Sequence, residues 1–345
     1  MTLQPLYRMA FLLLALLTPL CALAQAEASQ SVTIPSDPGV TLAGALRLPP
    51  HPYRAGAPAV LLLGGGGPSP KSIYPDVERR LLAAGIATLS FDKRGIGQST
   101  GTFIDTMDVA ERDAAAALQF LRSRPGIDPA RVAILGLSQG GAIGPRLAVR
   151  FPPIAALVLL AAPAGQKGKL FLDGMHAQLH AGGMTDHALE RIMPLTRSFM
   201  DARAAGLAQG AASPLRAALR DAFIAAGWAL DQAMGAIATL DDPVLVSMYQ
   251  VDASATLAQL EMPVLALYAG DDTIVSARLT VPEVKAALRD NPDATIIEVP
   301  GLNHGFQVLG TDASGKPERK GWPVSAPQVV DRIEAWLVKQ LRPQA

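Results

Sequence analysis

The sequence predicts an α/β domain built on a mostly parallel sheet. Apolar runs alternate with stretches of helical periodicity, and the runs at 132–137 (VAILGL) and 155–161 (AALVLLA) are continuously apolar. Such runs are typical of parallel strands that helices cover on both faces. The alternation stops near residue 164 and resumes near residue 261, which predicts one sheet domain interrupted by a helical insertion.

The elements can be predicted in chain order. Alternating residues around Gly39 predict a hairpin, with strands at 31–34 and 40–47, which a proline-rich stretch ends. The next apolar runs predict strands at 59–63, 86–91, 132–137 and 155–161, with helices over 107–124 and 140–150. After the insertion, strands are predicted at 264–268 and 295–299. Apolar residues at helical spacing then predict a closing helix that contains Val329, Ile333, Trp336, Leu337 and Leu341.

The middle of the chain predicts a helical lid. Residues 164–260 are rich in alanine and show no strand pattern, so we assign 27–163 and 261–345 to the core and 164–260 to the lid insertion. Six of the ten methionines lie in this insertion: Met175, Met184, Met193, Met200, Met234 and Met248. Methionine adapts to irregular apolar surroundings, so these residues either line a pocket for an acyl chain or fill contacts between helices.

Residues 1–26 predict a secretory signal peptide. The segment carries one basic residue, Arg8, then an apolar run, and small residues that predict cleavage near Ala24 or Ala26. The run is short for a membrane span, so we expect an exported protein, periplasmic or secreted, without a stable anchor. Cys21 is the only cysteine and follows Leu20, which predicts neither lipidation nor an internal disulfide in the mature chain.

Charge argues against a nucleic-acid partner. The chain has 30 basic and 30 acidic residues and no long block of one sign. A nucleic-acid-binding surface needs a basic field, which this balance does not provide. We therefore expect a small, largely uncharged substrate, with no metal and no cofactor.

The stretch GGGGPSPKS, residues 64–72, is close to a phosphate-binding loop. It matches G-x-x-x-x-G-K-[ST] at every fixed position except one, where Pro70 replaces the last glycine. A phosphate cradle consists of backbone N–H groups, and Pro68 and Pro70 have none. The sequence therefore predicts another role for this loop, in which Lys71 is dispensable.

The pentapeptide Gly136-Leu-Ser138-Gln-Gly140 follows a predicted strand and runs directly into a predicted helix. This context is that of a nucleophile elbow, in which a sharp turn lifts the serine hydroxyl out of the sheet. Glycines are needed two residues on either side because side chains there would collide. Ser138 is therefore the candidate nucleophile.

A serine nucleophile needs a base and a group that orients the base. Of the five histidines, His304 follows the strand predicted at 295–299, at the sheet edge where α/β proteins bind ligands. The others lie before the sheet or in the insertion: His51, His176, His180 and His187. The pair His176 and His180 has zinc-binding spacing but lacks the glutamate of H-E-x-x-H, so both are interpreted as polar positions on a helix face.

The acid is expected between the serine and the histidine in chain order. Asp271 and Asp272 both follow the strand predicted at 264–268. We prefer Asp272 because the apolar residues after it return the chain to packed structure, although either aspartate could instead cap the helix that follows.

An oxyanion hole requires two backbone N–H donors. One is expected from Gln139, the residue after the nucleophile, and the other from the loop after the third strand. The glycines at 64–67 occupy that position and allow the backbone to approach a substrate closely. We predict Gly66 as the donor, with Gly65 as the alternative.

Together these features resemble the α/β-hydrolase superfamily. Within it, the sequence is similar to esterases and serine aminopeptidase-like proteins with a G-S-G-P loop, here 65–68, and a D-K-R-G-x-G-x-S turn, here 92–99. The resemblance implies an eight-stranded, mostly parallel sheet and a triad of Ser138, Asp272 and His304. Gly66 replaces the serine of G-S-G-P, which leaves a backbone donor intact. The glycines at 95–101 do not fit a dinucleotide fingerprint, so this turn is interpreted as structural.

The sequence thus predicts a serine hydrolase of carboxylic esters that works through an acyl-enzyme, acting on a small-molecule ester or acyl substrate. The alternatives are a peptidase or an acyl thioesterase with the same triad. From a different class, the chain could be a binding protein that has this fold without catalysis.

Overall fold

The predicted α/β sheet is present. The structure is a computed structural model that describes residues 28–50, 56–207, 213–311 and 317–342, so the predicted signal peptide and His51 lie outside the described residues. Within these ranges, eight strands form one sheet in the order β1-β2-β4-β3-β5-β6-β7-β8. Their bounds are β1 (Ala28–Pro35), β2 (Thr41–Leu48), β3 (Ala57–Leu63), β4 (Ala87–Phe91), β5 (Ile127–Leu137), β6 (Ala156–Leu160), β7 (Val264–Ala269) and β8 (Ala294–Val299).

The sheet is antiparallel at one edge and parallel elsewhere. The hairpin β1–β2 pairs antiparallel with itself and with β4, and every pairing from β4 to β8 is parallel. Strand β5 begins before the predicted residue 132, because Ile127 pairs with Ala57 beyond an irregularity in the register. The parallel pairings place the carboxyl ends of β3 and β5 to β8 at one edge.

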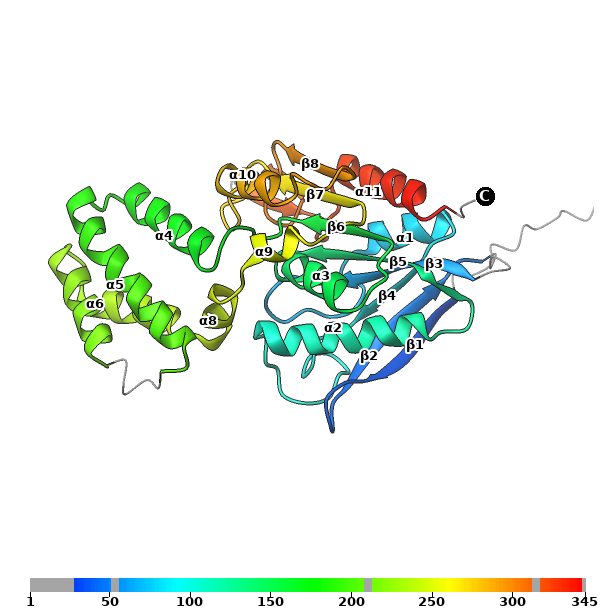
Figure 1. Ribbon diagram of the computed structural model, residues 1–345, viewed down its shortest axis with the longest axis horizontal. Helices are drawn as coiled ribbons and strands as arrows, with labels where there is room; N and C mark the ends of the chain where they lie inside the picture. The colour runs from blue at the N-terminus through cyan, green and yellow to red at the C-terminus, as the bar shows by residue number, and fades with distance from the viewer. Residues whose placement is uncertain (1–27, 51–55, 208–212, 312–316, 343–345) are drawn as a thin grey trace, which may run out of the picture.

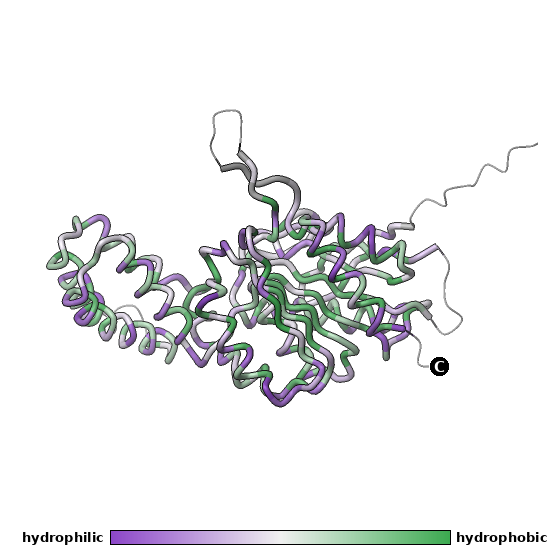
Figure 2. Tube along the Cα trace, turned by 90° about the horizontal axis from the view of Figure 1, so that it is seen from above, coloured by the Kyte–Doolittle hydropathy of each residue, from purple (hydrophilic) through white to green (hydrophobic). Residues whose placement is uncertain are grey.

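Helices cover both faces of the sheet, as the continuous apolar strands predicted (Figure 1). Every residue of β3, β6 and β7 is buried, and Figure 2 shows the hydrophobic residues concentrated in the central strands. Helices α1 and α11 pack against each other, as do α2 and α3 on the other side. The helices of this domain are α1 (Pro75–Ala83), α2 (Met107–Arg122), α3 (Gln139–Arg150), α9 (Ala253–Leu257), α10 (Ala277–Ala287) and α11 (Pro327–Gln340).

A second group of helices, which the chain forms after β6 and before β7, lies at the left of Figure 1. It has its own apolar core, centred on Leu189, Ile192, Phe199, Phe223 and Ile237, and it touches the sheet domain through the pairs α2–α8 and α4–α10. Its helices are α4 (Lys169–Ala181), α5 (Asp186–Ala204), α6 (Ser213–Ala225), α7 (Leu230–Leu240) and α8 (Pro243–Tyr249). We call α4 to α8 the helical insertion. Helix α9 lies within the predicted 164–260 range but packs against α3 and α10 of the sheet domain, and the boundary itself stays a prediction.

Three other features were not predicted. Helix α1 has only nine residues, four of them charged, and α10 contains Pro282 in its interior. After β8, the strands β9 (Val308–Thr311) and β10 (Pro317–Lys320) form a separate antiparallel pair.

Among the described residues, none of the helices has both the length and the apolar composition needed to cross a lipid bilayer.

Candidate active site

Ser138 occupies a strained turn between β5 and α3. Its φ of 54° and ψ of −114° are rare for a residue with a side chain, and such strain is typical of functional sites. A Cβ on Gly136 would lie 2.2 Å from the Gly140 carbonyl oxygen, and a Cβ on Gly140 would lie 2.7 Å from the Leu63 carbonyl oxygen. The two flanking glycines are therefore required by backbone atoms that no side-chain movement can relieve.

Asp272 and His304 form a preassembled pair. The two residues follow β7 and β8, and Asp272 Oδ2 lies 2.7 Å from His304 Nδ1. The other carboxylate oxygen of Asp272 accepts the N–H groups of Ile274 and Val275, each at 2.8 Å. The Asp272 side chain is fully buried, whereas Asp271 is exposed. The structure therefore joins Asp272 rather than Asp271 to the histidine.

The three residues of the predicted triad lie at the same edge of the sheet. Ser138, Asp272 and His304 follow the carboxyl ends of β5, β7 and β8, which are neighbouring parallel strands with β6 between β5 and β7. A neutral His304 that donates Nδ1–H to Asp272 keeps a lone pair on Nε2. Within the described part of the chain, the Ser138 hydroxyl has no hydrogen-bond partner, and Ser138 lines a cavity.

The glycine loop lies against the nucleophile elbow. A Cβ built on Gly65 would be 3.6 Å from Ser138 Cβ, and one on Gly66 would be 4.0 Å from Gln139 Cβ. The Gly67 N–H donates to Asp105 Oδ2 at 2.6 Å, so this N–H is not free to bind a substrate oxygen. The predicted donor Gly66 and the predicted partner donor Gln139 therefore lie next to each other.

The Lys71 side chain forms its contacts with the turn at 92–101 rather than with the glycines at 64–67. Its Nζ donates to Asp92 Oδ2 at 2.8 Å and to Gln98 Oε1 at 3.1 Å, and its N–H donates to Asp92 Oδ1. Burial raises the pKa of Asp92, but the N–H of Gln98 and the contacts from Lys71 outweigh it, so the pKa is lowered overall. These contacts agree with the expectation that 64–72 is not a phosphate-binding loop.

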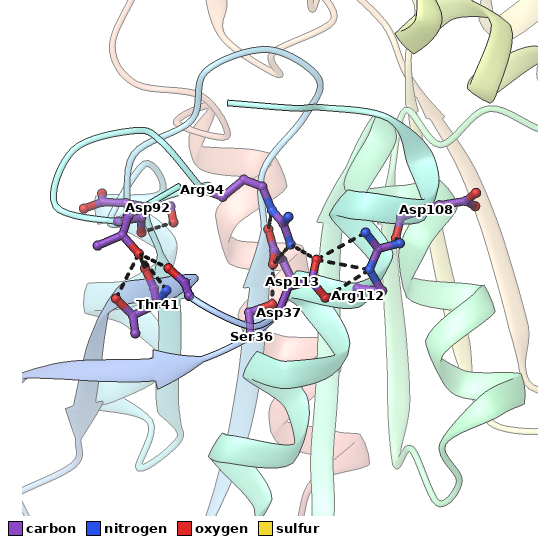
Figure 3. Close-up of polar contacts among 11 residues, drawn as sticks. Ser36, Asp37, Thr41, Asp92, Arg94, Asp108, Arg112 and Asp113 are labelled. Atoms are coloured by element: carbon purple, nitrogen blue, oxygen red, sulfur yellow. Dashed lines mark hydrogen bonds and ion pairs between the residues drawn. The ribbon is translucent and has the colours of Figure 1, made fainter. Parts of the chain in front are cut away.

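The turn at 92–101 is held by ion pairs centred on the buried Arg94 and Asp113. Arg94 lies 2.6 Å from Asp113 and 2.9 Å from Asp37, and Arg112 also pairs with Asp37. These contacts can be followed in Figure 3. Hydrogen bonds from Arg112 and Arg94 lower the pKa of Asp37. A Cβ on Gly97 would lie 2.5 Å from Asp92 Oδ2. This contact accounts for a glycine at position 97, so a nucleotide-binding role is not needed to explain it.

A cavity of about 480 Å³ lies between the sheet domain and the helical insertion. Ser138 lines it together with apolar residues of both parts: Met107, Ala142, Ile274 and Val275 from the sheet domain, and Phe171, Met175, Leu240, Leu245 and Met248 from the insertion. Its lining, all within the described residues, includes no aspartate, glutamate, lysine, arginine or histidine. The cavity suits an uncharged, largely apolar group next to the nucleophile.

The methionines of the insertion divide between the two interpretations given above. Met175 and Met248 line the cavity, whereas Met184 and Met200 are buried in the core of the insertion. Sequence reasoning could not separate them, because the difference depends on which face of each helix meets the sheet domain.

The other histidines that the structure describes are not part of this site. His176 and His180 lie on the exposed face of α4 with their rings stacked 6.4 Å apart, and His187 is exposed on α5. His180 Nε2 is 3.5 Å from Asp186 Oδ1. No group of three or more potential metal ligands occurs within the described ranges. These positions agree with the interpretation of polar residues on a helix face.

Comparison with known proteins identifies the family. The serine aminopeptidase, S33, family matches residues 57–308, which is well over half of the chain. The chain belongs to this family. It is thus a member of a hydrolase family and has the α/β-hydrolase fold.

Curated relatives match a smaller part of the chain, and a solved structure shows the same fold over most of it. An uncharacterized protein of Mycobacterium tuberculosis is 36% identical over 132 residues, 38% of this chain and 45% of that protein. A protein of Arthrinium phaeospermum named a thiohydrolase is 30% identical over 39% of this chain and 43% of its own. The chain thus matches less than half the length of these curated relatives. Among solved structures, the Pyrococcus furiosus esterase Pf2001 matches 92% of this chain and 94% of its own at 15% identity, with a TM-score of 0.55.

Proposed function

We propose that this protein hydrolyses carboxylic esters of uncharged, largely apolar acyl groups through Ser138, His304 and Asp272. The observation that carries the proposal is the hydrogen-bonded pair of buried Asp272 and half-buried His304, at the sheet edge that also presents the strained Ser138. Both are features of a serine hydrolase, and neither is needed by a protein that only binds a ligand.

The proposed reaction has two stages. His304 Nε2 takes the proton of the Ser138 hydroxyl, whose oxygen attacks the ester carbonyl, while the N–H groups of Gly66 and Gln139 stabilise the negative charge on the carbonyl oxygen. The C–O bond to the alcohol then breaks and His304 protonates the departing oxygen. Water, deprotonated by His304, attacks the acyl-enzyme in the same way and releases the acid and Ser138.

The cavity favours an ester over an aminopeptidase substrate. An aminopeptidase has to hold the free ammonium group of its substrate, and burying an ammonium without a partner is costly. No carboxylate belongs to the residues that line this cavity, all of which the structure describes. A thioester remains the second candidate, because its acyl group makes the same demands and one relative is named a thiohydrolase.

A substrate panel tests the proposal. The wild type and Ser138→Ala are assayed on p-nitrophenyl esters of increasing chain length, on uncharged N-acetylcysteamine thioesters and on aminoacyl anilides. We expect hydrolysis of the esters, with kcat lowered by about 10⁴-fold or more in Ser138→Ala. Equal activity of the two proteins would disprove the mechanism, and activity confined to the anilides would replace the ester proposal with a peptidase.

A further inference from the structure

A largely buried lysine contacts the glycine loop. Lys93, in the turn after β4, donates from Nζ to the Gly65 carbonyl oxygen at 2.7 Å, to Asp105 Oδ1 at 2.6 Å and to Gln139 Oε1 at 2.8 Å. Its side chain is 13% exposed, and that of Asp105 is 3% exposed. An ammonium group has three N–H donors, so each donor of Lys93 has one acceptor.

Asp105 and Gln139 close the set of contacts. The second carboxylate oxygen of Asp105 accepts the Gly67 N–H at 2.6 Å, and the Gln139 side chain donates from Nε2 to the Asp105 carbonyl oxygen at 2.8 Å. Lys93 and Asp105 therefore connect the glycine loop to the first residue of α3. These are the two segments from which the proposed oxyanion donors come.

The contact between Lys93 and the Gly65 carbonyl oxygen determines which way the Gly66 N–H points. The Gly65 carbonyl and the Gly66 N–H belong to one planar trans peptide, so they point in opposite directions. Holding the carbonyl oxygen on Lys93 therefore turns the Gly66 N–H away from Lys93. The same peptide borders the elbow, since a Cβ on Gly65 would be 3.6 Å from Ser138 Cβ.

We propose that Lys93 is a positioning residue that holds the Gly65–Gly66 peptide with the Gly66 N–H directed at the developing oxyanion. This inference rests on the proposed serine hydrolase function. Lys93 is not among the residues that line the cavity beside Ser138, so its role is exerted through the loop. Four consecutive glycines have many accessible backbone conformations, so a donor among them is effective only if something fixes the peptide. Preorganised donors stabilise a transition state because they need no reorientation during the reaction.

The charge of Lys93 is part of this role. Burial lowers the pKa of Lys93, and the neighbouring Asp105 carboxylate, with a smaller contribution from Asp113, opposes that shift. A neutral amine has only two N–H donors, so it could not satisfy the carbonyl, the carboxylate and the amide oxygen together. Asp105 therefore both accepts a hydrogen bond from Lys93 and favours the ammonium form.

Lys71 provides a matched control. It too forms an ion pair with a buried aspartate and lies just beyond the glycine run, but its Nζ contacts Asp92 and Gln98 rather than the Gly65 carbonyl. Replacing either lysine with methionine removes an ion pair of similar length. Only Lys93→Met releases the peptide whose N–H we assign to the oxyanion hole.

The test compares Lys93→Met, Lys71→Met and Asp105→Asn with the wild type. Steady-state assays on a p-nitrophenyl ester give kcat and KM, an alkyl fluorophosphonate reports the rate of Ser138 labelling, and urea denaturation reports stability. We expect Lys93→Met to lower both kcat and the labelling rate by about 10- to 10³-fold, with KM changed less than about threefold. Lys71→Met should leave kcat and labelling within about twofold of the wild type.

Asp105→Asn keeps the shape of the side chain but places an N–H₂ group against either the Lys93 ammonium or the Gly67 N–H, both of which are donors. We therefore expect it to lower kcat and the labelling rate, as Lys93→Met does. Values within about threefold of the wild type for Lys93→Met, or for Asp105→Asn if Lys93→Met does not fold, would overturn the positioning role. A change in KM alone would also overturn it. Failure of the wild type to react with both probes would instead contradict the proposed function.

Discussion

The sheet domain and the helical insertion use their apolar residues differently. In the sheet domain, entire strands such as β3 and β7 are buried, and their side chains pack against covering helices. In the insertion, α4 buries only Leu172 fully and places Phe171 and Met175 on the cavity. The sheet domain thus supplies Ser138, Asp272 and His304, while the insertion supplies much of the apolar lining of the cavity beside Ser138.

The largest expected effect separates two adjacent aspartates of the sheet domain. Asp272→Asn should lower kcat by about 10⁴-fold, because an amide that donates to His304 Nδ1 favours the tautomer that cannot take the Ser138 proton. Asp271→Asn should change kcat less than about threefold, since Asp271 is exposed and the hydrogen bonds to Ile274 and Val275 belong to Asp272. The measurement is kcat on a p-nitrophenyl ester for both variants. A greater loss in Asp271→Asn would show that the acid is wrongly assigned.

The second effect concerns the folding of the elbow. Gly136→Ala would place a Cβ 2.2 Å from the Gly140 carbonyl oxygen, and the neighbouring atoms are backbone that cannot move aside. We expect the free energy of unfolding to fall by about 3 kcal/mol or more, in the range of severe steric substitutions. Urea denaturation measures this change. A loss below about 1 kcal/mol would mean that the turn is wider than the structure shows.

The third effect belongs to the insertion. Phe171 lines the cavity and stacks edge-on against Tyr249, with ring centroids 6.0 Å apart. Phe171→Ala should lower kcat/KM for long-chain esters about tenfold and leave acetyl esters nearly unchanged, because pocket contacts of this size contribute about 1–3 kcal/mol. The ratio of kcat/KM for a long and an acetyl ester measures the effect. An equal loss on both esters would argue that the insertion supports the core rather than selecting the acyl chain.

The same comparison explains what could be predicted from the sequence. Parallel strands with both faces covered are continuous apolar runs, so β3, β5, β6 and β7 were recognisable, and the order of motifs along the chain indicated Ser138, Asp272 and His304. The assignment of catalytic roles to these residues stays a prediction. The structure adds the hydrogen bond between Asp272 and His304, which requires the ends of β7 and β8 to meet.

What could not be predicted depends on contacts between distant segments. Lys93 was part of a recognised turn, yet nothing local indicates that its ammonium is buried against Gly65, Asp105 and Gln139, which come from three other segments. A lysine after a strand is ordinarily exposed. The cavity was equally hidden, because residues of α4 and α8 meet Ser138 only after the insertion docks on the sheet domain.

The smallest effect tests how tightly the insertion is packed. Gly235 lies on the exposed face of α7, where an added Cβ would meet nothing within 4 Å. Glycine inside a helix destabilises it relative to alanine, so Gly235→Ala should raise the free energy of unfolding by about 0.5–1 kcal/mol. Urea denaturation of both variants should show that one added methyl group lowers the free energy of unfolding at Gly136, in the sheet domain, and raises it at Gly235, in the insertion. If Gly235→Ala were instead destabilising, this face of α7 would have to pack against a further surface. The α7 helix would then be covered on all sides, as the central strands of the sheet domain are.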